Sequence, residues 1–163
     1  VASSQFIGTL VGMALVDRFG RRPLVLISLV GIVFTLFVLG GSFYSSEGTG
    51  SMPLVCMCAY LLMFGIGLSP IPWVVNSEIH PMDVRGTVSG ITTCVNWIAN
   101  FVVASTFLDL ARMLSTNQVC PANHPDGAFW LYGIVGVAGF VWLALFMPET
   151  GGKSLEEMDA LFE

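Results

Sequence analysis

The sequence carries very little charge for its length. Only 10% of its 163 residues are Asp, Glu, Lys or Arg, whereas an ordinary soluble domain carries about 25%. Hydrophobic residues make up 55% of the chain, and its mean hydropathy is +0.80. These values exclude a typical soluble domain and indicate a protein that crosses a membrane several times.

Basic residues and metal-binding patterns are also scarce. The chain has six Lys and Arg in total and a net charge of −5, so it lacks the basic surface that nucleic-acid binding requires. Its four cysteines show no C-x-x-C or Cys/His spacing, and we expect neither a metal nor a cofactor. His80 and His124 fall at opposite membrane faces, and no nucleophile–base pair is visible, so we do not expect an enzyme.

Apolar runs divide the chain into predicted membrane spans. We expect five of them, at residues 1–16, 23–43, 54–79, 86–108 and 127–147, in an all-α membrane protein. The first run would be roughly 24 Å long as a helix, shorter than the ~30 Å hydrocarbon core, so we expect it to be truncated at its amino end. In this run Ser4, Gly8 and Gly12 form a ridge of small residues that favours close contact with another helix.

The distribution of basic residues predicts the orientation of the spans. Arg112 falls on one side of the predicted membrane, and the other basic residues fall on the opposite side: Arg18, Arg21, Arg22, Arg85 and Lys153. Basic residues in short loops mark the cytoplasmic side, so we place this larger group in the cytoplasm. In the tail at 148–163, Ser154 and Glu157 form a capping box, which predicts a short amphipathic helix on the cytoplasmic surface.

Charged residues gather at the predicted cytoplasmic ends of the spans. They are Asp17, Arg18, Arg21, Arg22, Glu78, Arg85 and Glu149. One interpretation is a set of solvated flanks. The other is a cytoplasmic gate of switchable salt bridges that locks helix ends together in one conformation. For such a gate we expect Glu78 to pair with arginines of the turn at 17–22, and Arg85 with an acid such as Glu149.

The third predicted span contains a break. Pro70 and Pro72 lack N–H groups, so the carbonyls of Ile66 and Leu68 lose their helical partners. Within a membrane such carbonyls are tolerated only where protein or a watery cavity surrounds them. The break therefore predicts a helix that lines a wet cavity, with Trp73 just beyond the kink.

The fourth span carries a polar stripe. Thr93, Asn96 and Asn100 recur at helical spacing, which places them on one face of the predicted helix. Such a face either lines a cavity or forms hydrogen bonds to a neighbouring helix, and the spacing alone leaves both interpretations open.

Several motifs resemble the sugar porter family of the major facilitator superfamily. They are D-R-F-G-R-R at 17–22, P-I-P-W and N-S-E-I-H-P within 70–81, N-W-I-A-N at 96–100 and P-E-T-G-G-K-S at 148–154. The resemblance implies a partial major facilitator fold that consists of this family's last five transmembrane helices. V-N-S-E-I at 75–79, S-T-F-L at 105–108 and G-A-F-W-L-Y at 127–132 look most similar to the proton-coupled myo-inositol, or polyol, cotransporters.

The resemblance also implies a solute site at the membrane midplane, between the two halves of the transporter. Gln5 and Asn96 match hydrogen-bonding positions, with Trp97 and Asn100 near the latter. Trp73 matches the tryptophan that packs on the solute ring, although core packing is the alternative for this residue. Amides supply the paired donors and acceptors that a polyol needs, and an aromatic ring offers a flat face to its C–H surface.

One departure from the family bears on the substrate. Glucose facilitators carry a glutamate eight residues before the tryptophan beside the kink, where this chain has Gly65. Glycine removes an acceptor for a hexose hydroxyl, and we expect it to leave room for another ring orientation or a water. The sequence therefore favours myo-inositol over glucose.

From these features we predict a secondary transporter that moves myo-inositol or a hexose by alternating access, as a proton symporter. A facilitative hexose transporter is one alternative, and a nutrient sensor on the same fold is an alternative of a different class. The expected partners are the polyol or sugar, protons, the lipid bilayer and a missing amino-terminal half, which in the resembling family supplies the coupling carboxylate. The expected location is the plasma membrane, with a vacuolar or lysosomal membrane as the alternative.

Overall fold

A computed structural model describes residues 2–45, 51–116 and 125–147 of the chain. Every regular element in these ranges is a helix, which confirms the predicted all-α fold. The tail at 148–163, with its predicted amphipathic helix, lies outside the described residues. The helices are α1 (Ala2–Phe19), α2 (Arg21–Tyr44), α3 (Met52–Ile66), α4 (Ile71–Glu78), α5 (Arg85–Met113) and α6 (Asp126–Phe146).

Four stretches are long and apolar enough to cross a membrane: α2, the combined α3–α4 stretch Met52–Glu78, α5 and α6. The apolar part of α1, Ser3–Val16, is shorter, as the sequence indicates. The helices follow the predicted spans, but α5 continues beyond 108 to Met113. Leu110 and Ala111 favour a helix, and the Asp109–Arg112 pair at 4.0 Å has the i,i+3 spacing of a helical surface.

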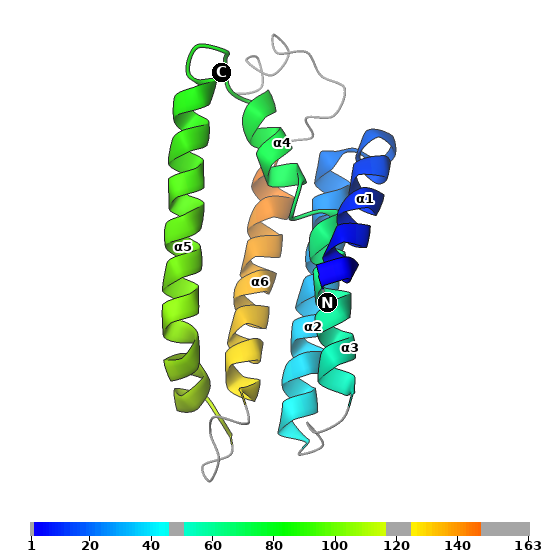
Figure 1. The fold of residues 1–163 in the computed structure, drawn as a ribbon, viewed down its shortest axis with the longest axis vertical. Coiled ribbons are helices and arrows are strands. Elements are labelled where there is room, and N and C mark those ends of the chain that lie inside the picture. Colours follow the sequence, from blue (N-terminus) through cyan, green and yellow to red (C-terminus); the bar gives the residue numbers. More distant parts are fainter. Residues whose placement is uncertain (1, 46–50, 117–124, 148–163) are drawn as a thin grey trace.

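The helices run side by side (Figure 1). The α1–α2 turn and the α4–α5 connection lie at one end of the molecule, and the last turns of α2 and α5 and the first turns of α3 and α6 lie at the other. The first end carries Arg18, Arg21, Arg22 and Arg85, and we call it the arginine end. Arg112 lies at the opposite end, as the distribution of basic residues predicts.

The turn between α1 and α2 depends on a single glycine. Gly20 joins the two helices with φ at 83°, a backbone conformation that other residues rarely adopt. Its N–H donates to the carbonyl oxygen of Val16 at 3.1 Å, which closes the last turn of α1. The D-R-F-G-R-R motif thus reverses the chain and brings arginines from two helices to the same end.

α1 packs against α3 through facing glycines. A Cβ at Gly8 would collide with the carbonyl oxygen of Leu62, and a Cβ at Gly12 with that of Ile66. From the other side, a Cβ at Gly65 would lie 2.6 Å from the carbonyl oxygen of Gln5. The two backbones are therefore in direct contact, as the ridge of small residues predicts.

The buried core lies where α2 meets α4, near the arginine end. Leu24 and Val25 of α2 and Ile71 of α4 are each at most 3% exposed. Partly buried residues of α1 and α6, such as Leu15 and Leu143, surround them. Because lipid tails are as apolar as these side chains, close packing rather than removal from water stabilises this core.

α5 stands apart from the other helices over its middle (Figure 1). Near the arginine end it contacts α4, where Asn76 bonds Ser89. Near the other end it contacts α6, where the rings of Phe107 and Phe129 lie 6.0 Å apart between centroids. Between these contacts, residues 94–106 are exposed on the described part of the chain.

Candidate solute site

The span formed by α3 and α4 is interrupted at residues 67–70. The regular helix ends at Ile66 and resumes at Ile71, at the position that Pro70 and Pro72 predict. Inside the break, the N–H of Ser69 donates to the carbonyl oxygen of Phe64 at 2.9 Å, a wider turn than an α-helix makes. The eight residues of α4 therefore form a separate helical segment.

α4 presents two different sides to its neighbours. Ile71 packs into the core against α2, and Glu78 forms an ion pair with Arg21 at the start of α2, at 2.8 Å. Asn76 lies on the opposite side and bonds α5. Trp73 is three residues before Asn76 and shares this second side of the helix.

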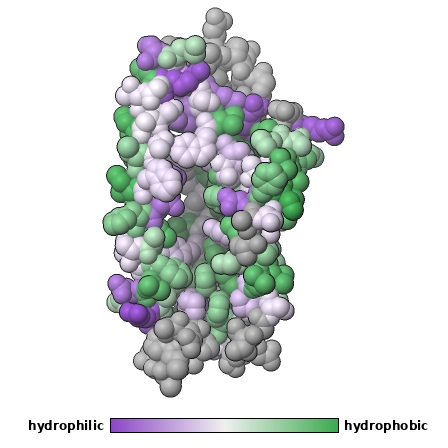
Figure 2. Space-filling model, in the orientation of Figure 1, coloured by the Kyte–Doolittle hydropathy of each residue, from purple (hydrophilic) through white to green (hydrophobic). Residues whose placement is uncertain are grey.

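A hollow runs along the face of the molecule that Figure 2 shows, between α5 on one side and α1 and α3 on the other. Pale and hydrophilic residues gather around the upper part of this hollow, and hydrophobic residues dominate the outer edges. This pattern is the one expected of a membrane protein whose outer surface contacts lipid while an inner surface contacts a wet cavity.

The predicted solute-binding residues come from three helices. Gln5 is on α1, Trp73 is on α4, and Asn96, Trp97 and Asn100 are on α5. Trp73 is 43% exposed and Trp97 is 69% exposed, while Gln5 is partly buried. Among the described residues, no hydrogen bond joins a predicted residue of one helix to a predicted residue of another.

The two asparagines of α5 form a local pair. The side-chain Nδ2 of Asn100 donates to the backbone oxygen of Asn96 at 2.9 Å and to its side-chain Oδ1 at 3.2 Å. Within the described residues, this leaves the Nδ2 group of Asn96 and the Oδ1 atom of Asn100 without a partner. A hydroxyl group both donates and accepts hydrogen bonds, so this donor and acceptor suit a polyhydroxylated solute. Thr93 instead donates to the backbone oxygen of Ser89 at 2.8 Å.

The position of Gly65 is filled by α1. A Cβ there would lie 2.6 Å from the carbonyl oxygen of Gln5 and 2.9 Å from the backbone nitrogen of Thr9. The expectation that this glycine leaves room for a water or another ring orientation is therefore wrong, because a helix backbone occupies that space. The absence of a side-chain acceptor at this position still distinguishes the chain from the glucose facilitators of the family that it resembles.

The charged residues of the predicted gate have several kinds of partner. The Arg21–Glu78 pair is largely buried, with side chains 19% and 28% exposed. Arg22 donates to the carbonyl oxygen of Ala144 at 2.5 Å and so connects α2 to α6. Both contacts lie at the arginine end and join helices of this chain to one another.

Among the described residues, Arg18 and Arg85 form no ion pair, and the predicted Arg85–Glu149 pair stays a prediction. Arg85 donates to the carbonyl oxygen of His80 at 3.2 Å, and it has no acidic partner among the described residues. Glu149, its expected partner, and the side chain of Asp17 lie outside the described residues. Arg18 is exposed.

Two polar side chains that connect helices were not among the predicted site residues. Ser28 is fully buried on α2, and its hydroxyl donates to the carbonyl oxygen of Met63 on α3 at 2.6 Å, one turn before the break. Asn76 connects α4 to α5. A lone serine in an apolar span forms no periodic pattern, so the sequence does not single out Ser28. Asn76 follows Trp73 at helical spacing, and this spacing could have identified it as a residue on the same helix face.

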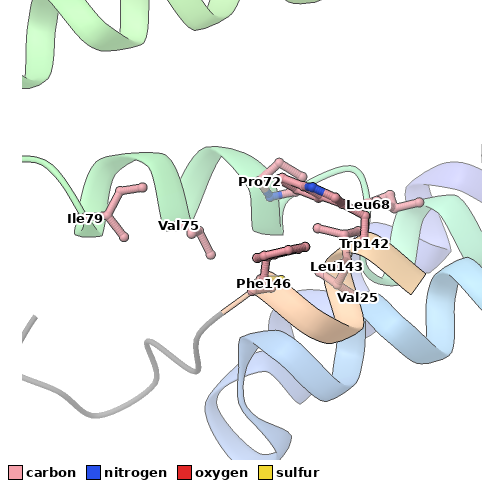
Figure 3. A pocket seen from close by; sticks show the side chains of 9 residues that line it. Val25, Leu68, Pro72, Val75, Ile79, Trp142, Leu143 and Phe146 are labelled. Carbon is pink, nitrogen blue, oxygen red and sulfur yellow. The ribbon is translucent and has the colours of Figure 1, made fainter. Parts of the chain in front are cut away.

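An almost entirely apolar cavity of about 290 Å³ lies on the core side of α4. Figure 3 shows Val75 and Ile79 of α4 on one side of it and Phe146 of α6 on the other. A second cavity of similar volume, also apolar, lies between α2 and α6. These cavities offer almost no hydrogen-bonding groups, so neither suits a polyhydroxylated solute.

Comparison with known proteins gives a consistent result. The family "Sugar (and other) transporter" matches residues 1–162. The chain is 37% identical to facilitated trehalose transporter Tret1 of Drosophila grimshawi, over 98% of this chain and 17% of that protein. It is 38% identical to trehalose transporter 1 of Drosophila melanogaster, over 95% of this chain and 18% of that protein.

Among solved structures, the chain is similar to XylE, a proton:xylose symporter of the major facilitator superfamily. The structure bound to 6-bromo-6-deoxy-D-glucose matches with a TM-score of 0.84 and 35% identity, over 99% of this chain and 33% of that one. The inward-open structure of XylE from E. coli matches with a TM-score of 0.81 and 34% identity. The chain thus spans less than a fifth of these trehalose transporters and a third of the solved symporter. It belongs to the sugar transporter family and has the membrane-spanning helices of part of the major facilitator fold.

Proposed function

We propose that the protein containing this chain moves a small polyhydroxylated solute across a membrane by alternating access. The observation that carries the proposal is the asparagine pair on the exposed middle of α5, which offers a free donor and a free acceptor among the described residues. A proline-broken helix with a half-exposed tryptophan accompanies it. The sugar transporters related to this chain support the same class of solute.

The three elements have complementary roles in this proposal. The amides of Asn96 and Asn100 bind hydroxyl groups, and the ring of Trp73 packs on the apolar C–H face of the solute. The broken helix allows α4 to shift relative to α3 as access alternates. Gln5 and Trp97 complete the site from α1 and α5, together with residues of the amino-terminal half.

The direct test is uptake by the full-length protein in vesicles. Asn96→Ala removes the free donor and the oxygen that accepts from Asn100, so we expect the KM to rise by about tenfold or more. A matched control is Thr35→Val on α2, because among the described residues the Thr35 hydroxyl bonds only backbone oxygens of its own helix, at Gly31 and Ile32. An Asn96→Ala variant with the uptake kinetics of the control, at equal surface expression, would contradict the proposed role.

We propose myo-inositol as the solute. The V-N-S-E-I segment resembles polyol cotransporters, and Gly65 provides no carboxylate for a hexose hydroxyl. The test is competition for labelled myo-inositol uptake by excess unlabelled myo-inositol, glucose, xylose and trehalose, the last two being solutes named for relatives of this chain. Competition by any of the other three that equals that of myo-inositol contradicts this assignment, while the transport function stands.

We also propose proton symport, at the plasma membrane. Symport is supported by the resemblance to proton-coupled cotransporters and by the name of the related xylose symporter. A protonophore should then abolish accumulation above equilibrium without abolishing equilibration. Accumulation that survives the protonophore contradicts symport, and uptake that never exceeds equilibrium supports a facilitative transporter instead.

A further inference from the structure

One amide connects the broken helix to the helix that carries the asparagine pair. The Nδ2 atom of Asn76 donates to the hydroxyl of Ser89 at 3.2 Å, and the hydroxyl of Thr92 donates to the Oδ1 atom of Asn76 at 3.4 Å. All three side chains are partly buried. We call this group the α4–α5 clasp.

The clasp has a fixed relation to two predicted solute-binding residues. Trp73 is three residues from Asn76 on α4, and Asn96 is four residues from Thr92 on α5, so each lies on the same side of its helix as the clasp. The two helices run in opposite directions, so both steps lead away from the arginine end (Figure 1). At 1.5 Å per residue the steps are about 4.5 and 6 Å, which brings Trp73 and Asn96 to nearly the same depth.

Besides the clasp, α4 and α5 are joined at the arginine end by the short connection at residues 79–84, where Arg85 donates to the carbonyl oxygen of His80. The break at residues 67–70 separates α4 from α3, and residues 94–106 of α5 are exposed. On its other side α4 is held to α2 by Ile71 and by the Glu78 ion pair. Within the described residues, the clasp is thus the hydrogen-bonded contact between side chains of α4 and α5.

We propose that Asn76 is a positioning residue for solute selectivity. It does not bind the solute; it sets the distance between the Trp73 ring and the Asn96 amide, and hence the size and shape of solute that can touch both. This inference rests on the proposed function. An apolar side chain at position 76 lets the two helices slide or separate, because apolar contacts have no preferred direction, whereas hydrogen bonds do.

The test uses the full-length transporter, three single variants and one double variant. Asn76→Leu removes both bonds of the clasp at similar side-chain size, and Thr92→Val removes one of them. Ser77→Ala is the matched control, because the Ser77 hydroxyl donates to the carbonyl oxygen of Val74 within α4 and, among the described residues, forms no hydrogen bond to another helix. Inhibition constants are measured for myo-inositol and glucose against uptake of the solute that the wild type transports.

For Asn76→Leu we expect the ratio of the two inhibition constants to change by about fivefold, against the solute that the wild type binds more tightly. A change of this size corresponds to the loss of one or two interhelical hydrogen bonds. Thr92→Val should change the ratio less and in the same direction, and adding it to Asn76→Leu should change nothing further. Ser77→Ala should keep the wild-type ratio. If Asn76→Leu does not fold, Thr92→Val alone decides the matter.

The outcomes separate this inference from the proposed function. The inference is wrong and the proposed function stands if the wild type transports a solute but Asn76→Leu keeps the wild-type ratio of inhibition constants. Where Asn76→Leu does not fold, the same result for Thr92→Val has this meaning. A loss of melting temperature with equal weakening for both solutes also overturns it, because a purely structural role has that effect. If the wild type transports and binds none of these solutes, the proposed function fails, and this inference fails with it.

Discussion

The contact between α1 and α3 gives a prediction that can be worked out from the structure. Gly65→Ala adds one Cβ, which would lie 2.6 Å from the carbonyl oxygen of Gln5 and 2.9 Å from the backbone nitrogen of Thr9. Both neighbours are backbone atoms, so neither can rotate away as a side chain would. We therefore expect the two helices to move apart.

Two opposing terms decide the size of the effect. Overpacking a well-packed site typically destabilises by about 1–3 kcal/mol, whereas Ala in place of Gly inside a helix stabilises by about 1 kcal/mol. Gly65→Ala should therefore destabilise by between about 0 and 2 kcal/mol. Gly139→Ala on α6 is the matched control, because a Cβ there meets nothing within 4 Å. The helix term is common to both variants, so the control should be more stable by about 1–3 kcal/mol.

The assay is thermal unfolding of the full-length protein in detergent, followed by intrinsic fluorescence. A change of 1 kcal/mol shifts the melting temperature of a domain of about 150–250 residues by roughly 2–4 °C, and that of a larger protein by less. Because this chain spans only a third of the related symporter, we expect Gly65→Ala to melt below Gly139→Ala by a few degrees at most. Equal melting temperatures for the two variants would refute the direct backbone contact between α1 and α3.

Two further predictions concern polar contacts at the two ends of the bundle. Glu78→Gln leaves Arg21 with a neutral partner in a largely buried pair and should destabilise the protein by about 1–2 kcal/mol, measured by denaturant titration. The control is Asp109→Asn, in an exposed pair at 4.0 Å, and an effect of Glu78→Gln no larger than that of the control would contradict the prediction. Asp126→Ala removes a fully buried carboxylate that accepts from the Thr116 hydroxyl at 2.6 Å and lies in the first turn of α6. It should destabilise by about 2 kcal/mol, and a melting temperature equal to that of Asp109→Asn would show that this contact does not hold α5 to α6.

The features that were predictable from the sequence depend on residues close together in the chain. Apolar runs set the spans, and Pro70 and Pro72 set the break, because a missing N–H acts within one helical turn. Gly8 and Gly12 lie four residues apart on one helix face, and this spacing predicts a close contact with another helix. The sequence does not indicate which helix they meet. The proximity of Asn96 and Asn100 likewise follows from their i,i+4 spacing.

Contacts between residues that are far apart in the sequence could not be predicted from local patterns. Ser28 bonds a carbonyl of another helix, and any hydroxyl in an apolar span has many such carbonyls to choose from. Asn76 was noticed only as part of a motif, since its partners lie across the α4–α5 connection and their register depends on how that connection folds. The error at Gly65 has the same origin, because the free space beside a glycine is decided by the helix that packs on it.

Gly65 also shows why a family's functional residues cannot be transferred one side chain at a time. In the glucose facilitators of the family that this chain resembles, a glutamate occupies the matching position, and its side chain needs space. Here the backbone of α1 at Gln5 and Thr9 fills that space. A carboxylate at position 65 is therefore compatible only with a wider separation of α1 and α3. Gly8 and Gly12 of α1 permit the present close approach from the other side, so the identity of residue 65 is linked to theirs. The residue at position 65 thus determines how closely α1 and α3 pack as well as whether an acceptor is present there.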